Sequence, residues 1–139
     1  MIAKKDIFAT LLRDNGYSLT SSRLAVFGVL SDGNPLTMSE LVKLCSSIDR
    51  ASVYRSIELF EKIGVAHRLY SGWKYRIELS ESFDHHHHHA TCTECGRNIV
   101  LEEDPSFETA IQKLATQYHF SVTSHQVELS GLCEMCRQK

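Results

Sequence analysis

The first half of the chain places apolar residues at the three-to-four-residue spacing of an amphipathic α-helix. Thr20 and the Thr37-x-x-Glu40 box are typical of helix starts. Gly64 is typical of a helix end, because glycine ends a helix without steric cost. The pattern predicts four helices, over residues 4–16, 19–33, 36–45 and 49–64.

The fourth predicted helix has two contrasting sides on a helical wheel. One side is apolar and is expected to be buried, with Val53, Ile57, Phe60 and Ile63. The opposite side is polar and aromatic, with Tyr54, Arg55, Glu58 and Glu61. The helix is therefore expected to pack against a core on one side and to face solvent on the other.

The spacing changes to the alternation of β-strands at residue 65. Residues 65–79 contain two strand-like runs around Ser71-Gly72, which predicts a β-hairpin. Several short helices followed by a hairpin are the order of elements in a winged helix-turn-helix. In that fold the last helix enters a major groove and the hairpin lies by the DNA backbone. The first part of the chain is therefore predicted to bind DNA.

A smaller α/β pattern follows the hairpin. It begins with a strand through the histidines and a second strand in RNIVLEE. A helix over 105–118 follows, with Pro105 in its first turn, and a long strand over 120–133 ends the pattern. This part has few apolar residues to bury, so it is expected to depend on a metal and a partner chain. The fold class is therefore α+β, with domains over residues 1–82, including the hinge, and 83–139.

Composition and charge narrow the class of protein. The 139 residues are 42% hydrophobic and 23% charged, and no apolar stretch approaches the roughly 18 residues of a membrane span. Residues 1–83 hold 11 Lys and Arg against 9 Asp and Glu, whereas residues 84–139 hold 4 against 8. This asymmetry indicates two parts with different tasks. The N-terminus lacks a signal-peptide pattern, so a cytoplasmic location is expected.

Four of the five cysteines form two Cys-x-x-Cys pairs. Four thiolates in two such pairs predict a closed tetrahedral structural zinc site, made by Cys92, Cys95, Cys133 and Cys136. Two separate redox pairs are the alternative. Cys45 stands alone on an amphipathic helix and is expected to be a buried apolar residue rather than a ligand.

Residues 85–89 are five consecutive histidines, directly before the first cysteine pair. On a strand, His87 and His89 share one face while His86 and His88 share the other, so one run can serve two metal sites. Imidazole binds zinc, iron(II), nickel and copper alike, and does not identify the metal. Further candidate ligands, each with a solvated surface residue as the alternative, are His67, Glu81, Glu108 and His125.

Two other classes of protein fit parts of this pattern. A zinc enzyme would need an open coordination position beside a general base, and His87, His89 and Glu81 offer one. No substrate pocket or nucleophile motif is evident, so the protein is not expected to be an enzyme. A metal store or chaperone accounts for the histidines but leaves the winged-helix part without a purpose. Sequence-specific DNA binding distinguishes a regulator from both.

The segments LTSSRLAVFGVL, ASVYRSIELFEKIGV, HHHHHATCTECGR and CEMC, in this order, resemble the ferric uptake regulator family over nearly the whole chain. The resemblance implies a metal-dependent transcriptional repressor that is a homodimer, with the second domain as the dimerisation domain. It also implies that two winged-helix domains bind an AT-rich inverted repeat in double-stranded DNA when a divalent metal is present.

The resemblance implies a metal at each of three sites. The four paired cysteines match the family's structural zinc site. A second set matches the metal site inside the dimerisation domain: His86, His88, Glu108 and His125. The regulatory site at the hinge is matched by Glu81, His87 and His89, with His67 in the position of a hairpin ligand of zinc-sensing relatives. Zn²⁺ readily accepts a set of three nitrogens and one oxygen. With His67 in this position, Zn²⁺ is favoured over Fe²⁺ as the regulatory metal.

The hinge region also departs from the family's iron and peroxide sensors. Asn34 stands where those sensors often have histidine, and Val100 stands where they have a carboxylate, with Glu102 as a shifted candidate. A cysteine that zinc sensors commonly have near Glu81 is absent as well.

The resemblance further implies DNA contacts from the recognition helix and its neighbour, which here are Arg23, Arg50, Ser52, Tyr54 and Arg55. The family's minor-groove lysine is replaced by Ser18.

Overall fold

The computed structural model describes residues 3–71, 73–83 and 86–139. The chain folds into two compact units, Met1–His85 and His86–Lys139, here called unit 1 and unit 2. The predicted domain boundary lies three residues earlier. Phe83 packs its ring edge-on against Phe27, with ring centroids 5.2 Å apart, and so belongs to the core of unit 1.

Unit 1 begins with the four predicted helices, α1 (Lys4–Asp14), α2 (Ser21–Leu30), α3 (Met38–Leu44) and α4 (Arg50–Lys62). The expected caps start them. The Thr20 hydroxyl accepts a hydrogen bond from the Arg23 N–H, and Thr37 and Glu40 form a complete capping box. Gly64 follows α4 with φ +79°, a left-handed conformation that glycine adopts without strain. The local signals in the sequence therefore placed these helices correctly.

The core of unit 1 is aromatic and aliphatic. Phe8 stacks on Phe27 with ring centroids 4.1 Å apart, and it meets Phe60 edge-on at 5.2 Å. The apolar side predicted for α4 is buried at Val53, Ile57 and Phe60. Unit 1 thus buries side chains from all four helices around one cluster.

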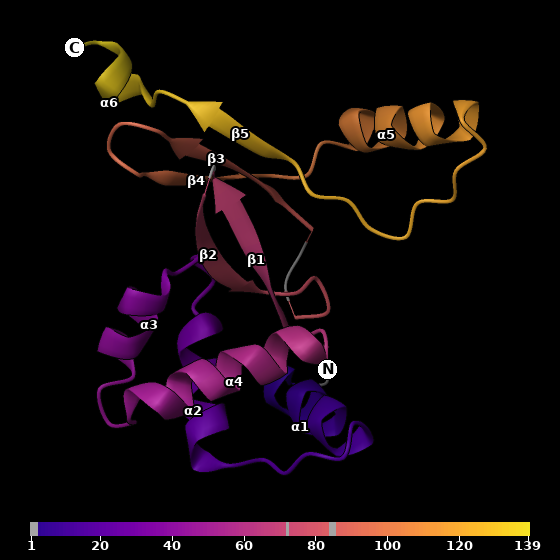
Figure 1. Ribbon diagram of the computed structural model, residues 1–139. Helices are drawn as coiled ribbons and strands as arrows, with labels where there is room; N and C mark the ends of the chain where they lie inside the picture. Colours follow the sequence, from indigo (N-terminus) through magenta and orange to yellow (C-terminus); the bar gives the residue numbers. More distant parts are fainter. Residues whose placement is uncertain (1–2, 72, 84–85) are drawn as a thin grey trace. The chain divides into compact units, whose positions relative to one another are not determined.

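Two strands complete unit 1, β1 (Ala66–Ser71) and β2 (Lys74–Leu79), as an antiparallel hairpin (Figure 1). Ser71 pairs with Lys74, so the turn lies one position later than Ser71-Gly72. Leu36 forms an isolated bridge with Ile77, which attaches the hairpin to the segment between α2 and α3. Helices followed by this hairpin are the predicted winged helix-turn-helix order.

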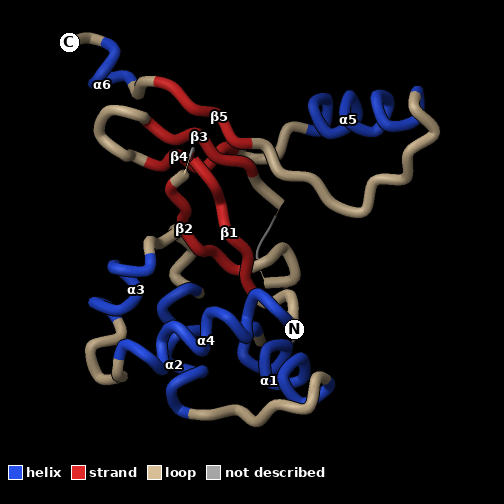
Figure 2. Tube along the Cα trace, in the orientation of Figure 1, coloured by secondary structure: helices blue, strands red, loops and turns tan. Residues whose placement is uncertain are grey.

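Unit 2 is a small sheet with one long helix and one short helix. Its strands are β3 (His88–Cys92), β4 (Asn98–Leu101) and β5 (Glu128–Gly131), in the order β4-β3-β5. Strand β4 is antiparallel to β3, and β5 is parallel to β3 (Figure 2). Helix α5 (Pro105–Gln117) lies between β4 and β5 in the chain, and α6 (Glu134–Arg137) ends the unit.

The long strand predicted over residues 120–133 is wrong for most of its length. Only Glu128–Gly131 pair with β3, and residues 120–127 contain no regular element. A strand needs a partner for its backbone hydrogen bonds, and β3 begins only at His88.

Within the described residues, no helix has the length and apolar character that a membrane span requires.

Candidate metal centres and nucleic-acid interface

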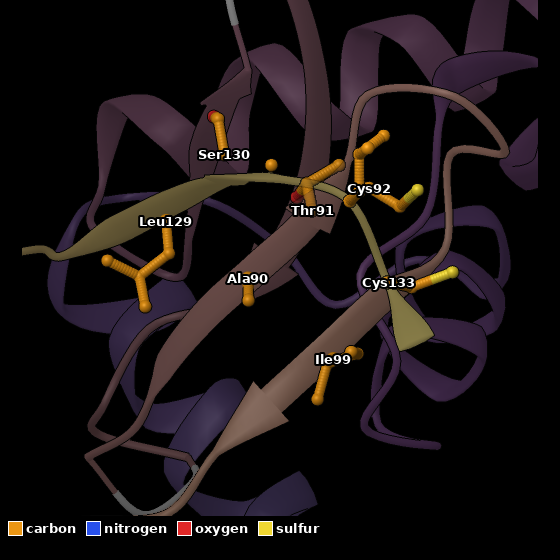
Figure 3. Close-up of a pocket in the computed structure, with 9 residues that line it drawn as sticks. Ala90, Thr91, Cys92, Ile99, Leu129, Ser130 and Cys133 are labelled. Carbon is orange, nitrogen blue, oxygen red and sulfur yellow. The ribbon is translucent and has the colours of Figure 1, made fainter. Parts of the chain in front are cut away.

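The four paired cysteines meet at one end of the sheet in unit 2. Cys92 ends β3, Cys133 follows β5 and caps α6, and Cys136 lies within α6. Their sulfur atoms and that of Cys95 all lie within 4.8 Å of one another. Gly96 has φ +75° and lets the chain turn tightly behind the first pair. Cys92 and Cys133 are among the residues that line a hollow of about 180 Å³ on the sheet, and Figure 3 shows their side chains.

The spacing and the acidity of these sulfurs fit the requirements of a tetrahedral zinc site. Zinc–sulfur bonds of about 2.3 Å place neighbouring sulfurs roughly 3.8 Å apart, and the Sγ atoms of Cys95 and Cys133 are 3.8 Å apart. Hydrogen bonds from the N–H groups of Cys95 and Cys133 lower the pKa of Cys92 to about 6. Burial, and the nearby sulfurs of Cys133 and Cys92, raise the pKa of Cys136 to about 12. Without a cation these thiols therefore resist ionising together, so the donor set fits Zn²⁺.

A second cluster forms where the histidine run approaches α5. The Glu108 carboxylate lies 2.7 Å from His88 Nε2, 3.2 Å from His86 Nε2 and 2.6 Å from His125 Nε2. The Nε2 atoms of His86 and His125 are themselves only 3.1 Å apart. Three imidazoles and one carboxylate therefore converge, as the resemblance implied. His125 reaches the cluster from an irregular segment rather than from the predicted strand.

Electrostatics in this second cluster favour a cation. Burial raises the pKa of Glu108, but the hydrogen bond from His88 and the positive charges of His125 and His86 outweigh it and hold this pKa below its usual value. An ionised carboxylate among imidazole nitrogens is a donor set that zinc and iron(II) both accept.

The four predicted hinge ligands are divided between the units. In unit 1, His67 lies on β1 and Glu81 is exposed in the turn after β2. In unit 2, the rings of His87 and His89 have centroids 4.7 Å apart. The structure thus brings the two histidines of unit 2 together.

The carboxylate beside His67 is that of Glu78, a residue that the sequence pattern did not indicate as a ligand. Glu78 is the cross-strand partner of His67, and its Oε1 lies 3.0 Å from His67 Nε2. The Glu78 side chain is nearly buried. A turn at Ser71-Gly72 would have paired His67 with a different residue, so the true register was the missing signal. A second missed carboxylate, Glu128, lies 3.5 Å from His89 Nδ1.

Val100, one of the departures from the iron and peroxide sensors, lies on β4, and Glu102, the shifted candidate carboxylate, follows it. Val100 is exposed and pairs with His89 across the sheet. Glu102 follows β4 and is exposed, outside the clusters of candidate ligands within the described residues.

The exposed side of α4 carries four of the five predicted DNA-contacting residues. Arg50 donates a hydrogen bond of 3.2 Å to the Tyr54 hydroxyl, and its guanidinium lies 5.3 Å from the ring centroid. Arg55 donates to the Ser52 hydroxyl at 3.1 Å. These contacts are local to the helix surface, so they leave the aromatic ring and both guanidinium groups accessible.

The fifth residue, Arg23, has a different environment at the start of α2. It donates a 2.6 Å hydrogen bond to the Ser18 carbonyl and lies 5.7 Å from the centre of the Tyr17 ring. These contacts tie the segment between α1 and α2 to the start of α2.

Comparison with known proteins decides the family. A family model described as "Ferric uptake regulator family" matches residues 14–130. The chain belongs to this family. As a member of the ferric uptake regulator family, it is a metal-responsive, DNA-binding transcriptional regulator.

Two relatives within the ferric uptake regulator family are equally similar to this chain. It is 32% identical over 137 residues to the "Peroxide-responsive repressor PerR" of Staphylococcus saprophyticus, covering 94% of this chain and 89% of the repressor. It is also 32% identical over 129 residues to the "Ferric uptake regulation protein" of Vibrio parahaemolyticus, covering 88% and 85%. Overall identity therefore does not select a sensing branch.

A solved structure from the ferric uptake regulator family confirms the fold class. The crystal structure of the Vibrio cholerae ferric uptake regulator matches this chain with a TM-score of 0.76 and 31% identity. The match covers 91% of this chain and 99% of that one. The predicted α+β class, with a winged helix-turn-helix followed by a small α/β unit, is therefore correct.

Proposed function

We propose that this protein is a cytoplasmic homodimeric repressor that binds an AT-rich inverted-repeat operator when its hinge site holds a divalent metal, with zinc preferred over iron(II). The observation that carries the proposal is the position of His67. This candidate ligand lies on the hairpin that directly follows α4, the helix with the exposed arginines. Only residues 63–65 separate α4 from this hairpin. A metal held partly by His67 is thereby linked to the DNA-reading surface.

The hinge site is proposed to consist of His67, His87 and His89 with one carboxylate from unit 1. Glu81 is the carboxylate that the resemblance implies, and Glu78 is the one in contact with His67. Three imidazoles and one carboxylate are a common tetrahedral set for Zn²⁺. The exposed Val100 removes a carboxylate ligand that an iron or peroxide sensor would use, which also supports zinc.

Two further metals are proposed within unit 2. The four cysteines hold structural zinc, which supplies folding energy by crosslinking β3 to the C-terminal segment. His86, His88, Glu108 and His125 hold a second divalent metal, because their donor atoms all lie within 4.8 Å of one another. These side chains orient one another through Glu108, which contacts all three histidines, and His88 is buried.

A second copy of the chain is the proposed partner of unit 2. Helix α5 has no buried residue, and its predicted apolar side remains exposed at Phe107 and Leu114. Figure 1 shows α5 beside the sheet rather than across its face. Strand β5 is an edge of the sheet, and Leu129 on it is 53% exposed. A small unit with these open apolar surfaces gains stability from a symmetric interface.

The regulatory step is proposed to be a population shift. When bound, the ion supplies coordination bonds that ligands from both units share. His67 then restricts the hairpin, and with it α4, to arrangements in which His87 and His89 are within ligand distance. A tenfold gain in operator affinity requires only about 1.4 kcal/mol of coupling.

At the operator, α4 is proposed to enter the major groove. Tyr54 contacts a thymine methyl group or a sugar, and Arg55 contacts a phosphate or a guanine edge. Arg50 and Ser52 contact phosphate at the start of the helix, and Arg23 does so from α2.

The test is fluorescence anisotropy with labelled duplexes drawn from a randomised pool that includes AT-rich inverted repeats. The protein keeps its cysteine-bound zinc, and buffered zinc and iron(II) are titrated separately without oxygen. Binding at low buffered zinc, with no response to iron(II), is expected. A response to iron(II) alone would identify an iron sensor, and the absence of metal-dependent binding to any duplex would refute the repressor.

Matched variants then assign the hinge ligands. His67→Ala is expected to abolish the zinc response, whereas His119→Ala, at an exposed histidine after α5, is expected to keep it. Glu78→Gln and Glu81→Gln form a second pair, and the ligand is the one whose loss weakens the zinc response. Equal zinc responses in His67→Ala and in the unmodified protein would exclude the hairpin from the regulatory site.

A further inference from the structure

An ion pair joins the end of α4 to the first strand of the hairpin. Arg68 on β1 donates two hydrogen bonds to Glu61 in the last turn of α4, one from Nε and one of 3.2 Å from a terminal nitrogen. Each carboxylate oxygen accepts one of them, so the pair is bidentate. Because a bidentate Arg–carboxylate pair is directional, it defines the angle between its two elements as well as their separation.

Arg68 also contacts the second strand of the hairpin. Its guanidinium lies 4.3 Å from the ring centroid of Tyr75 on β2, and Tyr75 packs against the core of unit 1. The side chains of Arg68 and Glu61 are 35% and 24% exposed, so water screens this pair less than an ion pair on the open surface. Arg68 is therefore a fixed connection between α4 and both strands.

The ion pair spans the segment where α4 gives way to the hairpin. Only residues 63–65, here called the joint, separate the two elements, and Gly64 within the joint has φ +79° (Figure 1). Buried apolar side chains such as Ile77 hold the hairpin on the core, but apolar contacts are non-directional. The contact between Glu61 and Arg68 crosses the joint and supplies the direction that apolar packing lacks.

The position of Glu61 is unfavourable for α4 taken by itself. The C-terminal end of a helix carries a partial negative charge, which favours a cation there and opposes a carboxylate. Lys62 is the residue in the last turn that suits this field. The favourable interaction of Glu61 therefore lies outside the helix, with Arg68 of the hairpin.

Arg68 is also the neighbour of the proposed zinc ligand on the hairpin. Successive side chains of a strand point to opposite faces, so His67 and Arg68 project from the two faces of β1. His67 contacts Glu78 across the strands, whereas Arg68 contacts α4. A change in the orientation of β1 imposed at His67 therefore reaches α4 through the next residue in the chain.

We infer that the Glu61–Arg68 pair is the positioning element through which metal at the hinge controls the orientation of the DNA-reading helix. This inference rests on the proposed function, because it names the contact that transmits the zinc response from His67 to α4. With the pair intact, the hairpin and α4 move as one body. Without it, zinc still restricts the hairpin, but α4 retains orientations that do not fit the operator. Glu61 and Arg68 act through α4 and are needed neither to hold zinc nor to touch DNA.

The coupling is measured as the ratio of operator affinities with and without buffered zinc, from the anisotropy of the labelled duplex selected from the pool. Arg68→Gln and Glu61→Gln are each expected to lower this ratio about fivefold, or about 1 kcal/mol, the upper value for exposed ion pairs. Lys62→Gln makes the same charge change as Arg68→Gln at an exposed neighbour, and is expected to keep the ratio. An unchanged ratio in Arg68→Gln, or an equal fall in Lys62→Gln, would overturn the inference.

A double variant tests whether the two residues act as a pair. Glu61→Gln combined with Arg68→Gln is expected to lower the ratio no further than either single change, because both remove the same contact. Arg68→Lys keeps the charge but loses the bidentate geometry, so its ratio is expected to lie between those of Arg68→Gln and the unmodified protein. Additive losses in the double variant would show that the residues act separately, against the inference.

Reciprocal measurements separate coupling from a general loss of structure. Because coupling between two ligands is mutual, the enhancement of zinc affinity by saturating duplex is expected to fall by the same factor in Arg68→Gln. Zinc affinity without DNA, measured by chelator competition, and operator affinity without zinc are both expected to be unchanged. An equal loss of operator affinity with and without zinc would reveal a purely structural role and overturn the inference alone. The absence of any zinc response in the unmodified protein would instead overturn the proposed function, and the inference with it.

Discussion

The two units of this protein reach a folded state by different physical means. Unit 1 buries a continuous cluster of aromatic and aliphatic side chains, in which Phe8, Phe27 and Phe60 are almost inaccessible to solvent. In unit 2, all of whose residues the structure describes, the buried side chains are Cys92, Cys133, His88 and His89. All four belong to the proposed metal ligands.

The two units therefore differ in what stabilises them. Unit 1 is expected to be stabilised mainly by its hydrophobic core, which leaves the exposed side of α4 free to contact DNA. Unit 2 has little apolar burial, so its stability is expected to come from metal coordination and from a partner chain. Metal and partner can therefore control unit 2 without unfolding unit 1.

The largest expected effect is loss of the structural zinc in unit 2. Cys95→Ser removes one of the four sulfurs of the site. Structural zinc sites have apparent zinc-binding free energies of about 10–16 kcal/mol. Amide hydrogen exchange is expected to become fast in β3 and β5 and to stay slow in α1 and α4. Cys45→Ala is the matched control, because Cys45 lies in the core of unit 1, and it is expected to retain full zinc content. If the β3 amides stay protected in zinc-free Cys95→Ser, unit 2 does not depend on the metal for its fold.

The second effect is a cavity in the core of unit 1. Phe60→Ala is expected to lower the free energy of unfolding of unit 1 by about 3–5 kcal/mol, because a fully buried phenyl ring is removed beside Phe8. Urea unfolding followed by helical circular dichroism measures the loss. Zinc bound by the cysteines is expected to remain, and its release together with the loss of helix would show that the units fold as one.

A third change tests the open side of α5. Leu114→Glu places a charge on the exposed apolar side, at an expected cost of about 1.5–3 kcal/mol per protomer to a symmetric interface. Analytical ultracentrifugation is expected to show monomers in place of dimers, with helical content unchanged. Thr116→Glu, on the opposite side of α5, is expected to leave the dimer intact. Dimers in both variants would place the interface elsewhere.

A fourth change separates DNA contact from metal binding. Arg55→Ala is expected to weaken operator binding about tenfold or more, or about 1.4 kcal/mol, because it removes a contact to phosphate or base. Zinc content is expected to be unchanged, since Arg55 donates a hydrogen bond to Ser52 on the same helix and belongs to none of the clusters of candidate ligands among the described residues. Arg13→Ala on α1 serves as the control in the same anisotropy assay. Retained affinity in Arg55→Ala would remove this residue from the interface.

The smallest effect concerns pH and the start of α4. A hydrogen bond from the Ser52 hydroxyl, and another from its N–H, hold the pKa of Asp49 below its usual value. The ionised form therefore stabilises the fold above the unfolded pKa of about 3.9, and this contribution is lost as pH falls through the folded pKa.

Asp49→Asn keeps a capping side chain without the titration. The urea midpoint of the unmodified protein is expected to fall more steeply than that of Asp49→Asn between about pH 5 and pH 3. Parallel pH profiles would show that this cap carries no electrostatic contribution.

Several features were predictable because their signals are local. Caps and helical spacing placed α1 to α4, and the spacing of two Cys-x-x-Cys pairs predicted the sulfur cluster that the structure brings together. The predicted alternation along the histidine run is also present, since His86 and His88 contact Glu108 while the ring of His87 meets that of His89 edge-on. Each of these depends on a few consecutive residues or on a fixed spacing.

Other features depended on how distant segments meet. Sequence alternation made residues 120–133 look like one strand, but only four residues found a partner in β3, and His125 reaches Glu108 from an irregular segment. The register of the hairpin placed Glu78 beside His67. A shift of one residue in a turn changes every cross-strand neighbour, and no local pattern distinguishes the two registers.

The sequence by itself determined the order of elements, the amphipathic side of α4, the two cysteine pairs and membership of the ferric uptake regulator family. These follow from periodicity and spacing, which are properties of neighbouring residues. The tertiary structure alone decided that α5 would be left without a buried side, that Glu78 would meet His67 and that Trp73 would stand in solvent. Those outcomes depend on which segments pack together, because burial and ligand contact are properties of pairs of residues far apart in the chain.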